Sequence, residues 1–251
     1  MNRVNVKLTL SYDGTNYFGF QTQESGNAVA DKLISSISKI EGENVEITCA
    51  GRTDSGVHAE GQVVNFFTSK VKLNENSWRD AINSSLPKDI QVIEAEFVPD
   101  TFNARTSACF REYWYKIVNA PVMPPLSVRF ALHYKYPLDL ELMKKYCPEL
   151  LGEQDFTAFS AATDTNISKK RFVYSASLEK DEDIVTFKIT ANAYLHNMIR
   201  IIVGTFLKFQ KEKRPPEEIK KILLSRDRTL AGPTISPKGL VFKKVYYPDD
   251  L

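Results

Sequence analysis

Apolar residues recur along this chain with two different periods, and the two periods alternate from one end to the other. In residues 4–10 every second side chain is apolar, which is the pattern of a half-buried strand. In residues 29–40 the apolar side chains instead recur three and four positions apart, which is the pattern of an amphipathic helix. Because the two patterns interleave in both halves, the sequence predicts an α+β (α/β-like) fold.

The same two patterns place the other elements. The remaining predicted strands cover residues 45–50, 62–68, 90–98, 110–118, 172–178, 185–189 and 240–247. The remaining predicted helices cover residues 78–85, 140–150, 195–207 and a segment that begins at Pro215-Pro216. We expect the strands at 172–178 and 185–189 to form a hairpin that turns at 180–183. In the strand at 110–118, Arg111, Tyr113, Tyr115 and Ile117 should share one face.

Composition excludes several classes of protein. The chain has 251 residues, of which 43% are hydrophobic and 25% charged, and this is ordinary for a globular protein with a real core. No apolar run reaches the roughly 18 residues of a membrane span, and the alternating N-terminus does not predict a secretory signal. The three cysteines, Cys49, Cys109 and Cys147, are widely spaced and fit no disulfide framework. A reducing, cytoplasmic setting is therefore expected.

The positive charge is concentrated in one region. The formal net charge is only +2, yet residues 200–228 contain nine Lys and Arg residues against four Asp and Glu residues. Such a region is able to meet the phosphates of a nucleic acid. The alternative is a solvated helical face with no partner.

One loop has an unusual sequence, Ala-Gly-Arg-Thr-Asp-Ser-Gly-Val-His-Ala at residues 50–59, between two predicted strands. Its two glycines permit tight backbone geometry, and between them lie Arg52 and Asp54. Functional residues are commonly placed on loops that a rigid sheet supports. The alternative is a turn in which Asp54 only caps backbone amides.

Two further residues are candidates for chemistry. Arg200 lies within the most apolar predicted helix, where a buried guanidinium needs a carboxylate partner, unless it lies at the edge of the apolar stripe and reaches water. Tyr113 lies on an aromatic-rich strand, where its ring either stacks on an unpaired base or belongs to the core.

Other chemistries lack support in the sequence. The three histidines, His58, His133 and His196, share no metal-ligand spacing, so we expect no metal site. No Gly-rich phosphate loop is present, so we expect no nucleotide cofactor. Nothing places Cys49 and His58 together with an orienting group as a nucleophile and its base.

In combination, the motifs of this chain resemble a known family nearly end to end. The matching segments are Tyr12–Gln21, Ala50–Val63, Asn83–Ile90, Phe102–Arg105, Arg111–Tyr115, Leu151–Phe156, Asn192–Gly204, Ala231–Thr234 and Gly239-Leu240. In this order they resemble the TruA-type tRNA pseudouridine synthases. The chain departs from the family pattern at Phe20, at Ala28–Asp31 and at Ile235–Pro237.

The resemblance implies a fold, an activity and partners. Two mixed-sheet halves, residues 1–105 and 106–251, should join into one continuous sheet with helices packed on it and the active cleft between them. The first half should carry the Asp54 loop, and the second the Tyr113 strand, the Arg200 helix and the basic region. The protein should be a homodimeric isomerase that binds tRNA and converts uridine to pseudouridine at positions 38 to 40 of the anticodon arm, with no cofactor and no metal.

The resemblance also implies a role for each site residue. Asp54 should be the catalytic carboxylate, which attacks C1′ or C6 or accepts the 2′ proton; the sequence leaves these routes open. Arg200 should pair with Asp54, and Tyr113 should stack on the uracil and help to remove the C5 proton after the uracil turns, so both count as catalytic. Arg52 should enter the RNA, and Leu240 should line the pocket. Two other functions are to be weighed against this one: a catalytically silent tRNA-binding protein on the same scaffold and a metal-dependent RNA hydrolase.

Overall fold

The chain forms two compact units. The computed structural model describes residues 3–23 and 26–250. The first unit comprises the chain up to Cys109 together with the segment from Phe242 onward, and the second comprises Phe110–Val241. The C-terminal segment thus groups with the first unit, whereas the predicted domains, 1–105 and 106–251, assign it to the second.

The first unit is built on strands of a β-sheet, in which its first strand pairs antiparallel with both of its neighbours. Its strand order is β4 (Ile90–Val98), β1 (Val4–Tyr12), β3 (His58–Thr68) and β10 (Leu240–Tyr246), and β2 (Thr48–Cys49) also pairs with β3. Leu8 of β1 lies opposite Val64 of β3 and Ala95 of β4. The predicted alternation is confirmed, since Val6, Leu8 and Leu10 are fully buried. The strand predicted at 45–50 is shorter than expected and contains only Thr48 and Cys49.

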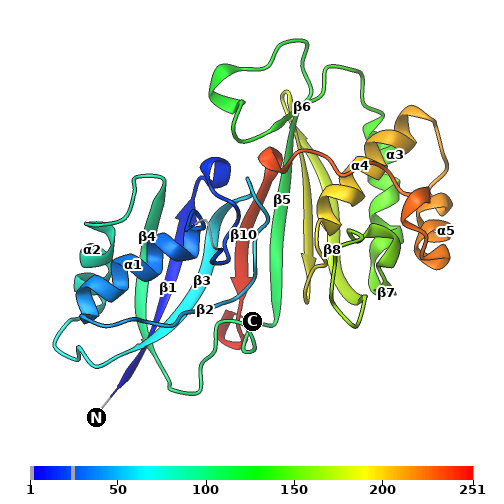
Figure 1. Ribbon diagram of the computed structural model, residues 1–251. Coiled ribbons are helices and arrows are strands. Elements are labelled where there is room, and N and C mark those ends of the chain that lie inside the picture. The colour runs from blue at the N-terminus through cyan, green and yellow to red at the C-terminus, as the bar shows by residue number, and fades with distance from the viewer. Residues whose placement is uncertain (1–2, 24–25, 251) are drawn as a thin grey trace. The chain divides into compact units, whose positions relative to one another are not determined.

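Two helices pack together on this sheet, α1 (Val29–Glu41) and α2 (Glu75–Asn83) (Figure 1). Ser36 of α1 donates a hydrogen bond to the carbonyl oxygen of Ile82 in α2, at 2.8 Å. The Trp78 ring of α2 meets the Phe66 ring of β3 edge to face, with centroids 5.3 Å apart. These contacts make one core from both helices and the sheet.

A buried pair of asparagines crosses the first unit between β1 and β3. The Asn65 amide donates to the side-chain oxygen of Asn5 at 2.9 Å, and the Asn5 amide donates to the carbonyl oxygens of Pro99 and Phe102. The Asn65 oxygen accepts from the Ala104 amide at 2.8 Å. Buried polar groups are tolerated when they are paired in this way, and here they hold residues 99–104 against the sheet.

The strands of the second unit pair in a mixed arrangement. Its strand order is β5 (Phe110–Val118), β9 (Ile184–Ala191), β8 (Lys170–Asp181) and β7 (Gly152–Asp155), all antiparallel, and β6 (Leu132–His133) pairs with β5 in parallel. The hairpin of β8 and β9 is confirmed, with Glu182 at its turn in the left-handed region. The predicted face of β5 is confirmed too, since its members are all buried: Arg111, Tyr113, Tyr115 and Ile117.

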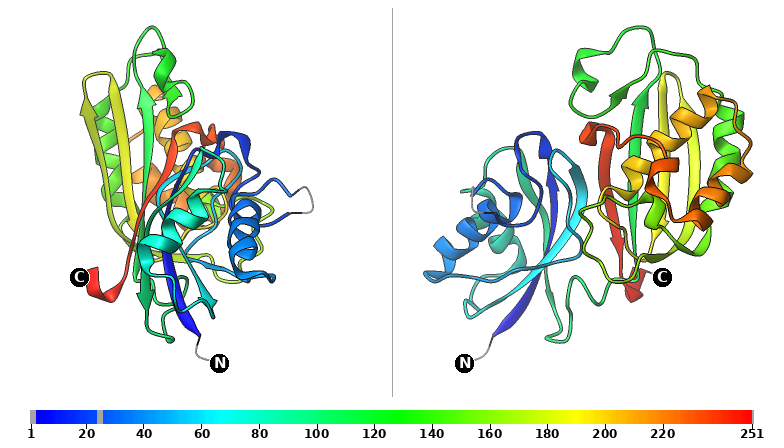
Figure 2. Two further views of the ribbon diagram at one scale, coloured as in Figure 1. Left: turned by 90° about the vertical axis from the view of Figure 1, so that its left-hand side faces the viewer. Right: turned by 45° about the vertical axis from the view of Figure 1, so that its right-hand side comes forward.

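Three helices pack on the strands of the second unit, α3 (Leu140–Tyr146), α4 (Met198–Lys211) and α5 (Glu217–Ser225) (Figure 2). The Phe206 ring of α4 contacts both Tyr146 of α3 and Phe187 of β9. Helix α4 begins three residues later than predicted, because Asn197 takes the left-handed conformation, with φ +62°. The α+β fold class is therefore confirmed in each unit. Short 3-10 turns cover Gly14–Asn16, Pro125–Ser127, Cys147–Leu150, Thr157–Phe159, Arg228–Leu230, Pro237–Gly239 and Pro248–Asp250.

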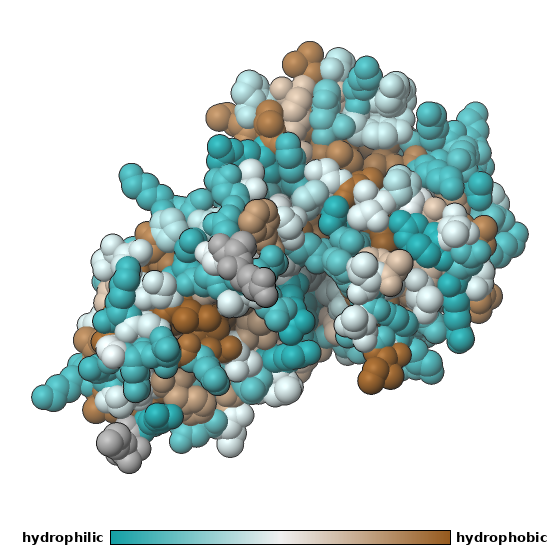
Figure 3. Space-filling model, viewed as in Figure 1, coloured by the Kyte–Doolittle hydropathy of each residue, from teal (hydrophilic) through white to brown (hydrophobic). Residues whose placement is uncertain are grey.

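Apolar side chains gather on the surface of one loop, the connection between β5 and β6 (Figure 3). Val122 and Leu126 of this loop are 75% and 92% exposed, and Val128 is exposed as well. A small buried cluster of Val118, Ala120 and Ala131 lies at the base of the loop. The loop is thus anchored at its ends while it exposes apolar residues to solvent.

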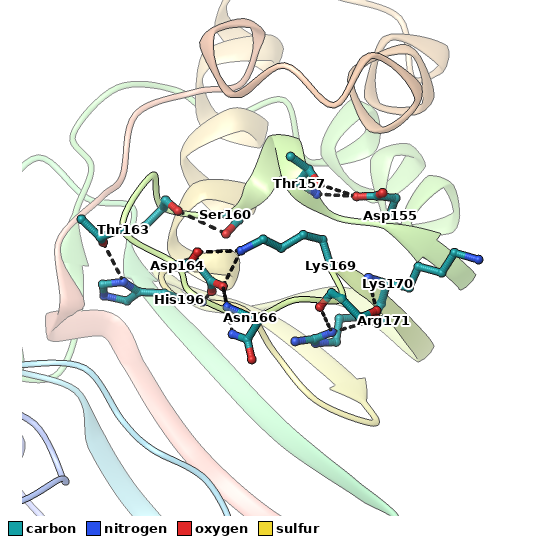
Figure 4. A network of polar contacts seen from close by, with 12 residues as sticks. Asp155, Thr157, Ser160, Thr163, Asp164, Asn166, Lys169, Lys170, Arg171 and His196 are labelled. Atoms are coloured by element: carbon teal, nitrogen blue, oxygen red, sulfur yellow. Dashed lines mark hydrogen bonds and ion pairs between the residues drawn. The ribbon is translucent and has the colours of Figure 1, made fainter.

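A polar network holds the loop that precedes β8 (Figure 4). The side chain of Asp164 is fully shielded from solvent, and its carboxylate accepts bonds from Lys169 Nζ at 2.5 Å and from the His196 amide at 2.6 Å. The amide of Asn166 donates to it at 2.8 Å. Burial alone would raise the pKa of Asp164, but these donors outweigh it and hold the pKa well below its usual range.

Replacing Asn65 by Ala should destabilise the first unit, because the Ala104 amide and the Asn5 side-chain oxygen would lose their buried partner. We expect the free energy of unfolding to fall by about 2–4 kcal/mol, as measured by urea denaturation. The exposed Asn76 is a matched control, and Asn76→Ala should change it by less than about 0.5 kcal/mol. Equal stability of the two variants would show that the network contributes nothing.

Acid should remove the stabilisation that Asp164 provides. A carboxyl group whose pKa is depressed in the folded protein contributes stability above its unfolded pKa of about 4, and this stability is lost as the pH falls below that value. At pH 7 we expect Asp164→Asn to be less stable than the wild type by about 2 kcal/mol. In urea titrations from pH 7 to pH 2.5 the two curves should converge below pH 4, and parallel curves would contradict the assignment.

Candidate active site

The loop that carries Arg52 and Asp54 spans residues 50–57, between β2 and β3. The Val57 amide donates to the carbonyl oxygen of Asp54 at 3.1 Å, and Gly56 has φ +76°. A positive φ at the third residue of a tight turn is the geometry for which glycine is suited. Arg52 is exposed and Asp54 is half-buried, so the turn presents both charged side chains from one short segment.

The backbone of residues 14–20 supports this loop at very close range. A Cβ atom on Gly14 would lie 1.9 Å from the carbonyl oxygen of Val57, and one on Gly19 would lie 2.6 Å from that of Thr53. Gly19 also has φ +92°. Only glycine permits these two approaches without displacing the loop. The Phe20 amide then donates to the Thr53 carbonyl oxygen at 3.0 Å.

Side-chain hydroxyl groups complete the support. The Tyr12 and Thr53 hydroxyls lie 2.8 Å apart, and Thr53 is the buried residue between Arg52 and Asp54. Burial raises the pKa of the Tyr12 phenol, which therefore stays protonated and able to hydrogen-bond. The Ser55 hydroxyl and the Gly56 amide both donate to the carbonyl oxygen of Tyr17. The loop is thus bonded on both sides of Asp54.

Cys49, next to this loop, does not have the character of a nucleophile. Burial is the largest influence on its thiol and raises the pKa, although the positive charge of Arg52 opposes this effect. A thiol nucleophile needs a lowered pKa. In the described part of the chain, no three His, Cys, Asp or Glu side chains are grouped so that they could hold a metal ion.

Tyr113 lies in the second unit, on the buried face of β5, and is 7% exposed. Its ring meets the Tyr194 ring edge to face, with centroids 4.9 Å apart. The Tyr194 hydroxyl donates to the carbonyl oxygens of Arg111 and Ile189, both at 2.9 Å. These bonds tie the Tyr194 ring to β5 and β9, and Tyr194 in turn fixes the orientation of Tyr113.

Arg200 lies in the first turn of α4 and is half-buried. Its Nε donates to the carbonyl oxygen of Ile235 at 2.7 Å, and its Nη1 donates to Asn197 Oδ1 at 2.5 Å. The side chain therefore lies at the edge of the buried stripe of α4, where protein groups direct its guanidinium. Its expected pairing with Asp54 remains a prediction.

The segment that supplies the Ile235 carbonyl is pressed onto α4 by two glycines. A Cβ atom on Gly204 would lie 2.0 Å from the Pro233 carbonyl oxygen, and one on Gly232 would lie 2.5 Å from the Thr205 amide nitrogen. The Gly232 amide donates to the Thr205 hydroxyl at 2.8 Å. This contact gives a physical reason for the Ala231–Thr234 motif. A larger residue at Gly204 or Gly232 would push the segment of residues 231–235, called the strap below, away from Arg200.

Leu240, the last of the predicted site residues, begins β10 and is buried. The residues just before it are held by Tyr115, whose hydroxyl donates to the Ser236 carbonyl oxygen at 2.7 Å. A Cβ atom on Gly239 would lie 2.5 Å from the Lys116 carbonyl oxygen. The start of β10 is therefore closely fitted to β5.

Many charges of the basic region at 200–228 are neutralised locally. Arg214 pairs with Glu212 at 2.6 Å and with Glu218 at 4.0 Å, and Arg226 pairs with Asp155. Lys221 pairs with Glu218 as well. The region is thus less positive in effect than its composition indicates.

The predicted site residues fall into two sets. The first unit contains Arg52 and Asp54, and the second contains Tyr113, Arg200 and Leu240. Sequence reasoning missed the residues that hold them, chiefly Tyr12, Thr53, Tyr194 and Asn197. The glycines of residues 14–19 were the available signal for the first set. Tyr194 and Asn197 lie within the matching segment Asn192–Gly204, but nothing in that segment singled them out.

Comparisons with known proteins agree with these motifs. The family model described as tRNA pseudouridine synthase matches residues 9–106 and 147–248. The tRNA pseudouridine synthase A of Brachyspira hyodysenteriae is 41% identical over 247 residues, which cover 98% of this chain and 99% of the relative. That of Thermoanaerobacter sp. (strain X514) is 43% identical over 243 residues, which cover 97% of this chain and 99% of the relative.

One solved structure is only distantly similar. The crystal structure of a Cbf5-Nop10-Gar1 complex matches with a TM-score of 0.38 and 13% identity, over 94% of this chain and 48% of that chain. None of the helices in the described part of the chain has the length and apolar character needed to cross a bilayer. On the family model and the near full-length relatives, the chain belongs to the tRNA pseudouridine synthase family of TruA type, isomerases that act on uridines of tRNA.

Proposed function

We propose that this protein isomerises uridine to pseudouridine at positions 38 to 40 of the tRNA anticodon arm, with Asp54 as its reacting carboxylate. The observation that carries the proposal is that Arg52, Asp54, Tyr113, Arg200 and Leu240 all occur within the segments that resemble the family's motifs. The family model covers four of them, in residues 9–106 and 147–248, and Tyr113 lies between its two matched ranges. A protein that only bound tRNA would have no need of a carboxylate that faces an anionic ligand.

The reaction balances without a cofactor. The bond between N1 and C1′ breaks, the uracil turns, a bond forms between C5 and C1′, and the proton lost from C5 is replaced by one gained at N1. No electrons are exchanged with a donor, and no water is consumed overall. Asp54 either attacks C1′ or C6 as a nucleophile or accepts the 2′ proton as a base, and each route requires an ionised carboxylate.

Arg200 is proposed to keep that carboxylate ionised. A guanidinium stays charged in proteins, and an opposite charge within about 4–6 Å favours the ionised form of a carboxyl group. Supporting this role, Ile235 and Asn197 direct two of the Arg200 nitrogens and so limit the positions of its charge.

The other residues are proposed to handle the nucleotide. Tyr113 stacks on the uracil, Leu240 forms part of the pocket wall, and Arg52 enters the RNA beside the extruded nucleotide. Flipping a base out of its stack costs a few kcal/mol, and less in a loop or at the end of a stem. The exposure of Arg52 on a rigid turn supports its part.

Binding of the whole tRNA is proposed to use the basic region at 200–228 and a second copy of the chain. Folded RNA is recognised largely through its shape and phosphates, for which a localised positive region suffices. A homodimer is in keeping with the exposed apolar residues of the loop between β5 and β6, because such patches commonly mark contact surfaces. We also propose that the protein acts in the cytoplasm.

Asp54→Asn should abolish turnover while tRNA binding persists, because the amide can neither attack carbon nor accept the 2′ proton. With tRNA labelled with tritium at C5 of uridine, we expect tritium release to fall at least about 10,000-fold. The dissociation constant from filter binding should change less than about threefold, since phosphate contacts dominate affinity.

The exposed Asp100 provides the control, and Asp100→Asn should release tritium at the wild-type rate. Wild-type protein that binds tRNA but releases no tritium would instead make this chain the silent tRNA-binding protein. Strand cleavage that a chelator stops would identify the metal-dependent hydrolase.

Removing three charges from the basic region should weaken tRNA binding. Arg214 is occupied by two glutamates, so Lys208, Lys211 and Lys213 are the better choice for a triple Ala variant. Each phosphate contact contributes a slope of roughly −0.7 to −0.9 to the plot of log K against log salt concentration. The slope should therefore become shallower by about 2 in binding titrations between 50 and 200 mM salt.

A control variant should leave that slope unchanged. Lys39, Lys70 and Lys72 are exposed lysines of the first unit, and their triple Ala variant removes the same net charge from outside the region. If both triple variants lower the slope equally, the contribution is general charge and the basic region is not the footprint.

A further inference from the structure

The loop that carries Asp164 bonds both backbone groups of His196, two residues before α4 begins. The Asp164 carboxylate accepts a hydrogen bond from the His196 amide at 2.6 Å. In the same loop, the Ala161 amide donates to the His196 carbonyl oxygen at 3.0 Å. The Thr163 hydroxyl lies 3.2 Å from the His196 ring nitrogen Nδ1. Three contacts from residues 161–164 therefore fix the position of a single residue.

The fixed residue is followed immediately by the one that directs Arg200. Asn197 takes the left-handed conformation with φ +62°, and its side-chain oxygen accepts a bond from Arg200 Nη1 at 2.5 Å. Asparagine tolerates this conformation better than most residues. A short relay thus runs from the Asp164 carboxylate through the His196 backbone and the Asn197 side chain to the guanidinium.

The carboxylate is itself buried and held from the opposite side. Its side chain is 0% exposed, and Lys169 donates both to the carboxylate and to the carbonyl oxygen of Asp164, at 2.5 and 2.8 Å (Figure 4). The Asn166 backbone and side chain add two more bonds. This end of the relay cannot turn away into solvent without leaving several donors unpaired.

We propose that Asp164 is a positioning residue for Arg200: through His196 and Asn197 it sets the place of the guanidinium and hence its action on the reacting carboxylate. The inference rests on the role of Arg200 in the proposed function. Misplacing a reacting group by about 1 Å can cost roughly a hundredfold in rate, so a small rotation of the turn at 196–197 should be visible in turnover.

The first test separates turnover from binding. Asp164→Asn should lower kcat for tritium release by about 10- to 100-fold and leave the dissociation constant of tRNA within about threefold of wild type. The control is Asp139→Ala, which removes the N-terminal cap of α3 in the same unit and should lower Tm by about 2–4 °C. It should leave kcat unchanged. An equal loss of kcat in the control, or no loss in Asp164→Asn, overturns the proposal.

A double-mutant cycle tests the relay itself. Asn197→Gly keeps the left-handed backbone accessible but removes the acceptor of Arg200, whereas Asn197→Asp retains an acceptor. Asp164→Asn should therefore cost no more than about threefold in kcat in the Asn197→Gly background, although it still lowers Tm there. In the Asn197→Asp background its full cost should remain. Independent, additive losses in both backgrounds would show that Asp164 acts by general stability alone.

Hydrogen exchange distinguishes a failure of this inference from a failure of the proposed function. Absence of tritium release in the wild type would refute the proposed function without any variant. The positioning is then judged from amide exchange of residues 195–201. Asp164→Asn should speed exchange there at least about tenfold and leave residues 140–146 of α3 unchanged. Unchanged exchange at 195–201 would overturn the positioning role.

Discussion

The close contact between the backbone of residues 14–19 and the loop at 50–57 is the constraint on which the placement of Asp54 depends. Two carbonyl oxygens of the loop lie only 1.9 and 2.6 Å from where the Cβ atoms of Gly14 and Gly19 would be, so no side chain separates the two segments. Backbone in van der Waals contact and bonded through fixed amides has few ways to move. The loop that carries Asp54 is thus restrained by direct backbone contacts, as a strand in a sheet is.

The second unit restrains Arg200 by a related device. Gly204 and Gly232 bring a strap onto α4, and the strap delivers the Ile235 carbonyl oxygen to the guanidinium. In both units, then, the position of a charged side chain, Asp54 or Arg200, depends on two backbone segments that lie in direct contact. A methyl group on one of the glycines at the contact would force the segments apart. Long charged side chains have large rotamer entropy, and these contacts restrict it before any ligand binds.

The parts of this structure that follow from local sequence are those in which a repeated pattern meets a buried face. The alternation in β5 predicted which side chains share one face, including Tyr113, and that face is buried, as a strand with one buried face must alternate. The strand expected at 45–50 is shorter because β2 pairs with β3 only at Thr48 and Cys49, and no pattern in one strand reveals where its partner stops. The early expected start of α4 reflects the same limit, since the left-handed turn at Asn197 leaves no periodic mark.

The candidate site residues show the same contrast between features that a local pattern reveals and features that only the fold creates. Asp54 stood out because a charged residue between two glycines in a loop is uncommon, and the family resemblance then gave it a role. Asp164 did not stand out, since its importance arises from donors at Lys169 and His196 that the fold brings together. Polar networks of this kind depend on long-range contacts, which a local pattern does not encode.

The proposed isomerisation, which balances without a cofactor, places an unusual demand on such supports. When a metal ion or a group donor takes part, its own charge supplies much of the stabilisation that the transition state needs. A carboxylate that acts without such help has only its ionisation, its direction and its distance from the sugar carbon. Each of these is set by neighbours, and an error in any of them lowers the rate directly. In the proposed reaction, Gly14, Gly204 and Asp164 therefore influence the rate through the groups that they position, although none of the three carries out a chemical step.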